Sequence, residues 1–250
     1  MIIWITGASS GLGRELARQY AEAGHQVCVS ARGTDALAEL AEECCDMTGT
    51  INSFGLDVTD PEQVNSCFEQ IKATTGIPNL CVFNAGTHTE NPVKGFDRKI
   101  YQRLMSINYM GVVNCLQVII PVYLQQGSGQ IAIVSSVAGY RGLPNASAYG
   151  ASKAALINMC EALQPELAAE NVDLRLINPG FVRTPLTDMN EFPMPFLMEV
   201  EDAAARMVKG LAGNSFEITF PRRFTWLLKC LCSLPYAVYL RLTRKLLRDV

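Results

Sequence analysis

Residues 2–13 read Ile-Ile-Trp-Ile-Thr-Gly-Ala-Ser-Ser-Gly-Leu-Gly, an apolar run that passes into a glycine-rich turn. Apolar residues at consecutive positions are typical of a strand buried on both faces of a sheet. A helical pattern follows from about Leu12 to Ala23, so the glycines lie where a strand ends and a helix begins. Glycines there let a phosphate approach the backbone and the free N–H groups of the helix N-terminus. Their spacing, GxxxGxG, is not the GxGxxG fingerprint, and a tight turn with incidental glycines stays an alternative.

The same alternation of apolar runs and helical patterns continues along the chain. The expected strands are 2–6, 26–31, 51–57, 80–84, 130–135, 172–178 and 216–220, and the expected helices are 12–23, 35–45, 61–74, 100–123 and 147–170. Strands joined by helices imply right-handed crossovers and a parallel sheet with helices on both faces. The sequence therefore predicts one doubly wound α/β domain over residues 1–221, with its ligand beyond the carboxyl ends of the strands.

Composition divides the chain into an acidic body and a basic tail. The 250 residues are 49% hydrophobic and 18% charged, with a formal net charge of −3, which suits a large core and argues against disorder. Residues 1–221 carry 14 Lys or Arg and 23 Asp or Glu, whereas residues 222–250 carry seven basic residues and one acid. The body is thus −9 and the tail +6, and an acidic body is not expected to bind nucleic acid.

Cysteine and histidine usage excludes several kinds of site. Nine cysteines are scattered without a CxxC pair, and His25 and His88 are the two histidines. We therefore expect no metal centre and no thioredoxin-type motif. The chain begins without a charged n-region or a cleavage site, and free thiols without a secretion signal favour the cytoplasm.

The end of the second expected strand indicates the nucleotide. An acid there would hold the ribose hydroxyls of NAD, but this chain has Ala31 followed by Arg32. A guanidinium suits a 2′-phosphate, so NADP(H) is favoured over NAD(H), unless Arg32 is only a solvated residue at a helix start. Asp57, at the end of the third strand, could accept from the adenine amine or simply begin a turn.

Six short motifs follow the strands in the order and spacing of one enzyme family. They are Thr6-Gly7-x3-Gly11-x-Gly13, Asn84-Ala85-Gly86, Asn108, Ser136, Tyr149-x3-Lys153, and Pro179-Gly180 with Thr184. On these motifs, residues 1–220 resemble the short-chain dehydrogenase/reductase family, which implies a single-domain Rossmann fold and NAD(P)-dependent oxidoreductase activity. A lone YxxxK could occur by chance, but no other tyrosine of this chain has a lysine four residues on.

The expected catalytic residues are Asn108, Ser136, Tyr149 and Lys153. Tyr149 and Lys153 share one helix face, and a phenol titrates near ~10, so we expect the ammonium to lower the pKa of Tyr149 into a useful range for acid–base work. Ser136 can hydrogen-bond the reacting oxygen. The resemblance implies that Lys153 also holds the nicotinamide ribose and that Asn108 supports a water-mediated proton relay. A core-facing Tyr149 with a snorkelling Lys153 is the alternative.

The resemblance also implies the cofactor contacts. Asn84 and Gly86 would line the adenosine side, whereas Thr184 and the backbone around Val182 would hold the nicotinamide carboxamide. The full expected set is Gly7, Ser9, Ser10, Gly11, Leu12, Gly13, Arg32, Asp57, Val58, Asn84, Ala85, Gly86, Tyr149, Lys153, Pro179, Gly180, Val182 and Thr184.

A substrate lid is implied at about 185–210. Residues 185–198 contain three Met and two Phe, and no Arg or Lys lies between Thr184 and Arg206. Such a segment favours a hydrophobic carbonyl compound or secondary alcohol, although these side chains could equally pack on the body or on another subunit. The alternatives are a 3-oxoacyl-thioester reductase and a non-catalytic NADP-binding regulatory protein. Arg141 and Asn145 either contact substrate or shape their loop, and His88 is expected to be a loop residue.

The tail, residues 222–250, lies outside the shared motifs. Its apolar stretch 224–240 has 17 residues and contains Lys229 and Pro235, which makes it marginal for a membrane span. Two amphipathic helices joined at 233–235 fit better, and their aromatic, leucine and basic residues are typical of an interfacial helix on anionic lipid. The tail could instead fold over the substrate mouth or cover the interface of a homodimer or homotetramer. A cytoplasmic enzyme peripheral to the inner face of a membrane is therefore one expectation among these.

Overall fold

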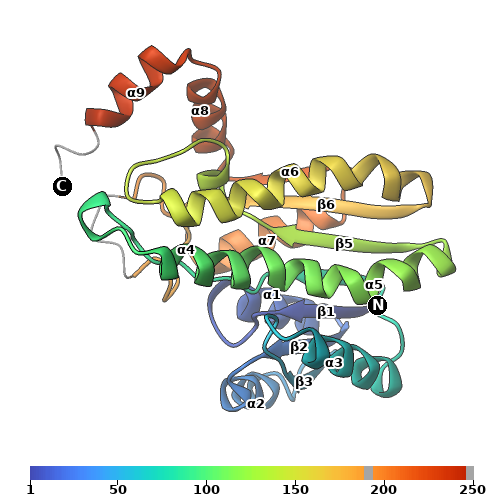
Figure 1. Ribbon diagram of the computed structural model, residues 1–250. Helices are drawn as coiled ribbons and strands as arrows, with labels where there is room; N and C mark the ends of the chain where they lie inside the picture. The colour runs from blue at the N-terminus through green and yellow to red at the C-terminus, as the bar shows by residue number, and fades with distance from the viewer. Residues whose placement is uncertain (189–193, 246–250) are drawn as a thin grey trace.

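The computed structural model describes residues 1–188 and 194–245 and shows a parallel sheet with helices on both faces (Figure 1). The strand order in this part of the chain is β3-β2-β1-β4-β5-β6-β7. The order reverses between β1 and β4, and in doubly wound sheets this reversal opens the crevice that binds a ligand. The strands are β1 (Ile2–Thr6), β2 (Gln26–Ala31), β3 (Thr50–Gly55), β4 (Leu80–Phe83), β5 (Gly129–Val134), β6 (Val172–Pro179) and β7 (Glu217–Phe220).

The sheet separates two apolar cores. Ile3 and Ile5 of β1 point into the core covered by α1, α2 and α7, whereas Trp4 between them points into the core covered by α3, α5 and α6. Both faces are buried, which explains why the strands are apolar at consecutive positions. The helices are α1 (Gly11–Glu22), α2 (Thr34–Glu43), α3 (Pro61–Thr74), α4 (Arg98–Met105), α5 (Gly111–Gln126), α6 (Ser147–Ala169), α7 (Val200–Leu211), α8 (Arg222–Cys232) and α9 (Tyr236–Lys245).

The helix expected over 100–123 is interrupted. A π-helical turn, Ser106–Met110, separates α4 from α5. Such turns are rare and often lie at functional sites, and this one contains Asn108. Within the described residues, Arg98–Gln126 is the helical stretch long and apolar enough to cross a membrane. Its residues Val112, Leu116 and Ile119 are buried in the core of the domain, and 44% of its most apolar 18-residue segment is buried.

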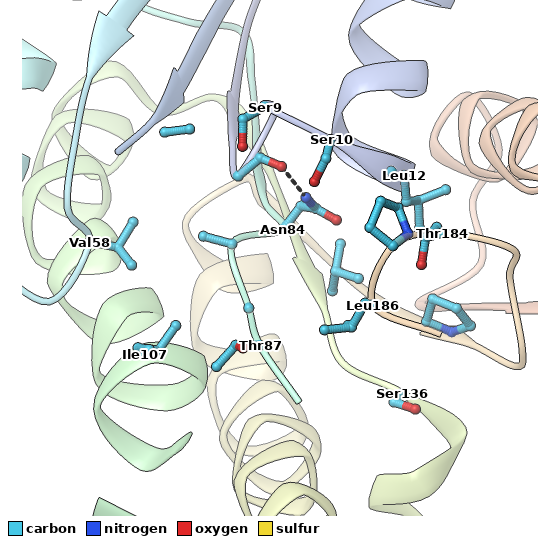
Figure 2. Close-up of a pocket in the computed structure, with 18 of the residues that line it drawn as sticks. Ser9, Ser10, Leu12, Val58, Asn84, Thr87, Ile107, Ser136, Thr184 and Leu186 are labelled. Carbon is cyan, nitrogen blue, oxygen red and sulfur yellow. Dashed lines mark hydrogen bonds between the residues drawn. The ribbon is translucent and has the colours of Figure 1, made fainter. Parts of the chain in front are cut away.

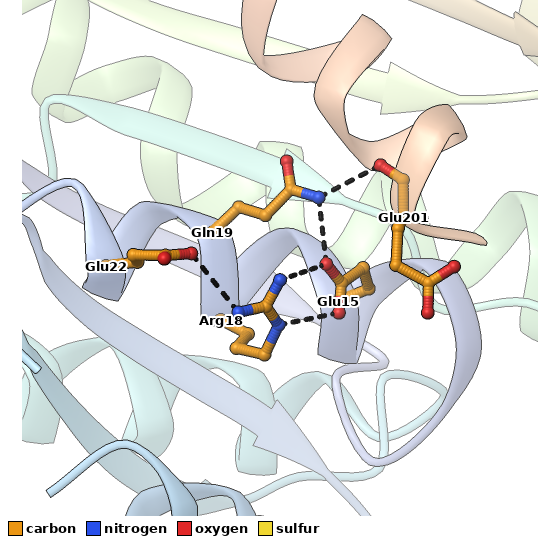
Figure 3. Close-up of polar contacts among 5 residues, drawn as sticks. All are labelled: Glu15, Arg18, Gln19, Glu22 and Glu201. Carbon is orange, nitrogen blue, oxygen red and sulfur yellow. Dashed lines mark hydrogen bonds and ion pairs between the residues drawn. The ribbon is translucent and has the colours of Figure 1, made fainter. Parts of the chain in front are cut away.

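Helix α7 contradicts the second half of the expected lid. Its residues Ala203 and Met207 are fully buried in the core shared with α1. Gln19 of α1 also donates to the backbone oxygen of Glu201 at 2.9 Å (Figure 3). A helix that completes the core cannot move as a lid, so the prediction for 200–210 was wrong. Residues 189–193 of the expected lid lie outside the described residues.

The tail folds into the two helices that the sequence predicts. α8 follows β7 directly at the carboxyl end of that strand, and α9 projects away from the body (Figure 1). The helices meet at Ser233–Leu234–Pro235. Most of their side chains are exposed, and Phe224, Thr225 and Tyr239 are the buried exceptions among the described tail residues.

Candidate cofactor and active site

A cleft of about 610 Å³ runs along the carboxyl ends of the strands (Figure 2). Loops that follow β1 to β6 line it, as the doubly wound topology requires. Figure 2 shows Ser9 and Ser10 at one end of this cleft and Ser136 at the other. Every residue that the sequence predicted for the site lines the cleft except Gly13 and Asn108, which lie behind its wall.

The glycine turn is packed tightly against the loop after β4. A Cβ on Gly13 would lie 2.5 Å from both the Gly7 carbonyl oxygen and Nδ2 of Asn84. Gly7 has a φ of +69°, and its Cβ would lie 2.6 Å from Cα of Ala85. Nδ2 of Asn84 donates to the Gly7 carbonyl oxygen at 3.0 Å. Gly13 therefore shapes the turn rather than the surface of the cleft, and Asn84 fixes the turn.

The N-terminus of α1 fits an anionic group. Its N-cap residue, Ser10, is extended and makes no side-chain capping hydrogen bond to the helix. The first N–H groups of α1 are therefore not satisfied by a cap, and they begin at Gly11, which lines the cleft. Together with the glycine turn that lines the cleft, this arrangement suits the pyrophosphate of a dinucleotide.

Arg32 and Asp57 lie along the same side of the cleft with different surroundings. Arg32 is exposed, and within residues 1–188 and 194–245 no carboxylate forms an ion pair with it. Oδ1 of Asp57 accepts from the backbone N–H of Thr59 at 2.9 Å and from the Thr59 hydroxyl at 2.8 Å. Asp57 thus builds a turn, which is one of its two predicted roles, and Arg32 stays free to bind a phosphate.

The catalytic candidates meet where β5 and α6 approach each other. Ser136 caps a short 3-10 turn, Val137–Gly139, and its Oγ accepts from the N–H of Ala138 at 3.1 Å. Nζ of Lys153 lies 5.8 Å from the centre of the Tyr149 ring and donates to the Val134 carbonyl oxygen at 2.9 Å. Tyr149, Lys153 and Ser136 all line the cleft, and their catalytic roles stay predictions.

The pKa of Tyr149 shifts against the expectation. Burial raises the pKa of Tyr149, and a hydrogen bond with Ser136 opposes that shift. Burial also lowers the pKa of Lys153 to about 8. The predicted net lowering of the phenol pKa was wrong, because desolvation outweighs the stabilisation of the phenolate that a nearby cation gives. A protonated Tyr149 is the form that can donate to a carbonyl oxygen.

Asn108 holds the loop beside the catalytic residues. Its Oδ1 accepts from the N–H of Thr87 at 2.8 Å, and its Nδ2 donates to the Thr87 carbonyl oxygen and to Oγ of Ser152, both at 3.0 Å. A Cβ on Gly86 would lie 3.3 Å from Oδ1 of Asn108 and 3.5 Å from Nζ of Lys153. Asn108 is thus a buried positioning residue, and its role in a proton relay stays a prediction.

Sequence reasoning missed several neighbours of the site. The His88 ring lies edge-on to Tyr149 with 4.7 Å between ring centres, and burial lowers the pKa of His88. Its place two residues after Gly86 was a usable signal, but the contact with Tyr149 depends on the fold. His88 does not itself line the cleft. The lining residues that were not predicted are Ser30, Ala31, Gly33, Leu56, Thr59, Thr87, Ile107, Val134 and Ser135, whereas Pro185, Leu186 and Thr187 belong to the segment predicted as a lid.

Arg141 connects the loop between Ser136 and Tyr149 to the tail. Its Nη1 donates to the carbonyl oxygens at the end of α8, the shortest bond being 2.7 Å to Leu234. The guanidinium also lies over the rings of Tyr239, at 3.9 Å, and Tyr236, at 4.8 Å. Arg141 thus binds the tail, a role that was not among the two predicted for it.

Comparison with known proteins agrees with this geometry. The model of the short chain dehydrogenase family matches residues 1–192. An uncharacterized oxidoreductase of Myxococcus xanthus is 36% identical over 217 residues, 87% of this chain and 86% of that protein. The 3-oxoacyl-[acyl-carrier-protein] reductase FabG of Thermotoga maritima is 32% identical over 184 residues, 74% of this chain and 75% of that protein.

Solved structures share the fold. A short-chain dehydrogenase from Sphingobium yanoikuyae in complex with NADPH has a TM-score of 0.81 at 23% identity, covering 94% of this chain and 97% of that one. A short-chain dehydrogenase/reductase from Burkholderia phymatum in complex with NAD has a TM-score of 0.84 at 23% identity, covering 91% of each chain. The chain belongs to the short-chain dehydrogenase/reductase family and is an NAD(P)-dependent oxidoreductase.

Proposed function

We propose that this enzyme catalyses hydride transfer between NADPH and a hydrophobic carbonyl compound or secondary alcohol. The observation that carries the proposal is the group formed by Tyr149, Ser136 and Lys153 at one wall of the cleft. The glycine turn that would hold a pyrophosphate lines the same cleft. One cavity therefore serves both the cofactor and the reacting oxygen.

Residues of this chain would hold the cofactor at its charged groups. The N-terminus of α1 would hold the pyrophosphate, and the guanidinium of Arg32 would bind the 2′-phosphate that distinguishes NADP from NAD. When bound, the nicotinamide supplies or accepts the hydride. The structural relatives include complexes with NADPH and with NAD, so Arg32 is the basis for proposing NADP(H).

Tyr149 moves the proton in this proposal. Its phenol gives a proton to the carbonyl oxygen during reduction and takes it back from the alcohol in reverse. The Ser136 hydroxyl donates to the same oxygen and stabilises its developing negative charge. Lys153, held by the Val134 carbonyl oxygen, places a positive charge beside the Tyr149 ring and favours the phenolate that remains.

Apolar side chains in the cleft support an apolar substrate. Ile107 and Leu186 line the cleft, and Leu186 belongs to the segment 185–198, which is rich in Met and Phe. A 3-oxoacyl thioester is the second candidate, because a relative at 32% identity is named as a 3-oxoacyl-[acyl-carrier-protein] reductase. A screen of NADPH oxidation across aldehydes, ketones and 3-oxoacyl thioesters separates the two substrate classes.

Replacing Tyr149 tests the mechanism. We expect Tyr149→Phe to lower kcat by about 10²–10⁴-fold, the usual contribution of a general acid, while NADPH binding measured by fluorescence titration is retained. Tyr20→Phe is the matched control, because Tyr20 is buried in the core and does not line the cleft. Turnover by Tyr149→Phe at the control's rate would exclude Tyr149 as the acid/base and leave a binding protein as the better explanation.

Replacing Arg32 tests the choice of cofactor. Arg32→Ala removes a charge-assisted contact worth about 1.5–3 kcal/mol, which corresponds to a loss of roughly tenfold or more in NADPH affinity. NADH affinity should stay within about twofold, since NADH has no 2′-phosphate. Equal weakening of both nucleotides would contradict the assignment of Arg32.

A further inference from the structure

The outward face of α8 and α9 is apolar and is not covered by the body. Trp226 is 72% exposed, Tyr236 is 75% exposed and Leu240 is 55% exposed. Leu227, Val238 and Leu242 are exposed beside them. Among the described residues, twelve large apolar side chains are exposed, and these two short helices hold six of them. Such a concentration marks an interaction surface rather than the scattered exposure that is normal for a protein surface.

Basic side chains are also exposed on these two helices. Every residue from Ile218 to Lys245 is neutral or basic, because the acids nearest in sequence are Glu217 and Asp249. Arg222, Arg223, Lys229, Arg241, Arg244 and Lys245 are all exposed. Of the six, Lys229 is the one with an ion pair in the described part of the chain, and its partner is Glu217. The other cations are available to an anionic partner.

Among the described tail residues, four side chains attach the tail to the body: Phe224, Tyr239, Tyr236, whose ring lies 4.8 Å from the Arg141 guanidinium, and Lys229, which pairs with Glu217. The Phe224 ring packs 5.7 Å from that of Phe181 and 5.8 Å from that of Phe196. The Tyr239 hydroxyl donates to the Gly142 carbonyl oxygen at 2.9 Å, on the side of α9 that faces the body. Trp226, Leu240 and Arg244 take part in none of these contacts, so they are not needed to hold the helices in place.

We propose that the outward face of α8 and α9 docks this enzyme on the surface of a bilayer that contains anionic phospholipid. Tryptophan, tyrosine and leucine side chains enter the headgroup region, and arginine and lysine side chains pair with the lipid phosphates. A bilayer surface accommodates both kinds of side chain along two short helices, whereas the tails of two copies would bring like charges together. The helices lie on the bilayer, because each is too short to cross it.

Tryptophan fluorescence gives a direct test. The chain has two tryptophans, and Trp4 is fully buried whereas Trp226 is exposed. We expect emission of the full chain to shift to the blue with phosphatidylcholine–phosphatidylglycerol vesicles and not with phosphatidylcholine vesicles. Trp226→Phe should still sediment with the anionic vesicles but show no shift, because Trp4 stays in the core. A protein that remains in the supernatant with both kinds of vesicle overturns the proposal.

Charge and apolar variants locate the contact. Arg241→Gln with Arg244→Gln should weaken binding to the anionic vesicles by about fivefold for each charge removed. The separate double variant Trp226→Ser with Leu240→Ser should weaken binding to the anionic vesicles more than the double arginine variant does. Met110→Ser with Leu124→Ser, which removes exposed apolar side chains from the helix α4–α5, is the matched control and should bind like the unaltered chain. Equal loss in the control overturns the proposal, as does a dimer in analytical ultracentrifugation that the Trp226 and Leu240 variant abolishes while no vesicles are bound.

Discussion

The cofactor cleft and the C-terminal tail are held by different kinds of contact. In the cleft, backbone meets backbone, and Gly13 has no room for a Cβ beside the Gly7 carbonyl oxygen. In the tail, two helices are attached through a few side chains, chiefly Arg141 and Phe224. At Gly7 and Gly13 the turn of the cleft therefore accepts glycine alone. The tail can lose an anchor without disturbing the sheet, so changes in the two regions should be separable.

The largest effect is expected at the glycine turn. Gly13→Ala places a Cβ 2.5 Å from the Gly7 carbonyl oxygen and from Nδ2 of Asn84, so the turn must move. We expect the free energy of unfolding to fall by about 1–3 kcal/mol, and NADPH affinity to fall more than tenfold because the turn is displaced. Urea denaturation and fluorescence titration measure the two effects.

Gly33→Ala is the matched control for the turn. Gly33 lines the same cleft, but a Cβ there would have no neighbour within 4 Å. We expect its stability and NADPH affinity to stay within a few tenths of a kcal/mol of the unaltered protein. If Gly13→Ala kept the stability and NADPH affinity of this control, the backbone around Gly13 would not be tightly packed.

Replacing Arg141 tests how firmly the tail is attached to the body. Arg141→Ala removes the donor to the carbonyl oxygens of Leu231, Cys232 and Leu234 and the stacking on two tyrosine rings. Hydrogen bonds from a charged group contribute about 1.5–3 kcal/mol, so amides of α8 and α9 should exchange at least tenfold faster. Amides of β1 and β5 should be unaffected.

The conservative variant separates charge from geometry at Arg141. Arg141→Lys keeps the charge but loses the planar guanidinium group. The amides of α8 and α9 in this variant should therefore exchange faster than in the unaltered protein and more slowly than in Arg141→Ala. Faster exchange throughout the sheet, rather than in the tail alone, would mean that the tail and the body unfold as one unit.

Most of the fold could be predicted, because each strand is a buried apolar run and each crossover is a helix. The residues that line the cleft could also be predicted, because Gly7 and Ser136 follow strand ends and Tyr149 belongs to a family motif. What could not be predicted depends on distant contacts. Arg141 meets partners about ninety residues away, as with Cys232. Helix α7 was assigned to a lid because the resemblance implies a variable segment after Pro179–Gly180, and the burial of Met207 against α1 depends on the fold.

Titration of Lys153 should make NADPH affinity and the free energy of unfolding change in opposite directions with pH. Its pKa in the folded protein is about 8, below its ordinary value of 10.5. As pH rises through about 8, the folded protein loses this cation, and NADPH affinity should fall. Over the same range the unfolded chain still binds the proton, so the free energy of unfolding should rise with pH.

Two variants of Lys153 isolate these signs. Lys153→Arg stays charged, so its NADPH affinity should change less between pH 7 and about pH 9. Lys153→Met has no proton to lose, and subtracting its unfolding curves removes the contribution of the cysteines and tyrosines. A difference that falls with pH would contradict a lowered pKa for Lys153.

The smallest effect is expected at the ion pair that joins the tail to the sheet. Lys229 pairs with Glu217, which also accepts from the Tyr140 hydroxyl at 2.6 Å and from Asn178 at 2.8 Å. Burial raises the pKa of Glu217, but these hydrogen bonds outweigh it and hold the pKa below its usual value. The stabilisation is therefore present above about pH 4.5 and lost as the pH falls below it.

Comparison of two variants assigns that stabilisation. The side chain of Lys229 is 48% exposed, so Lys229→Ala should lower the free energy of unfolding by less than about 1 kcal/mol. Glu217→Gln should cost more, because it weakens the bonds from Tyr140 and Asn178 inside the body as well. Urea denaturation at neutral pH and at about pH 4 measures both. If Lys229→Ala cost as much as Glu217→Gln, the pair would be a principal anchor, and the tail would be bound to the body more firmly than its few side-chain contacts indicate.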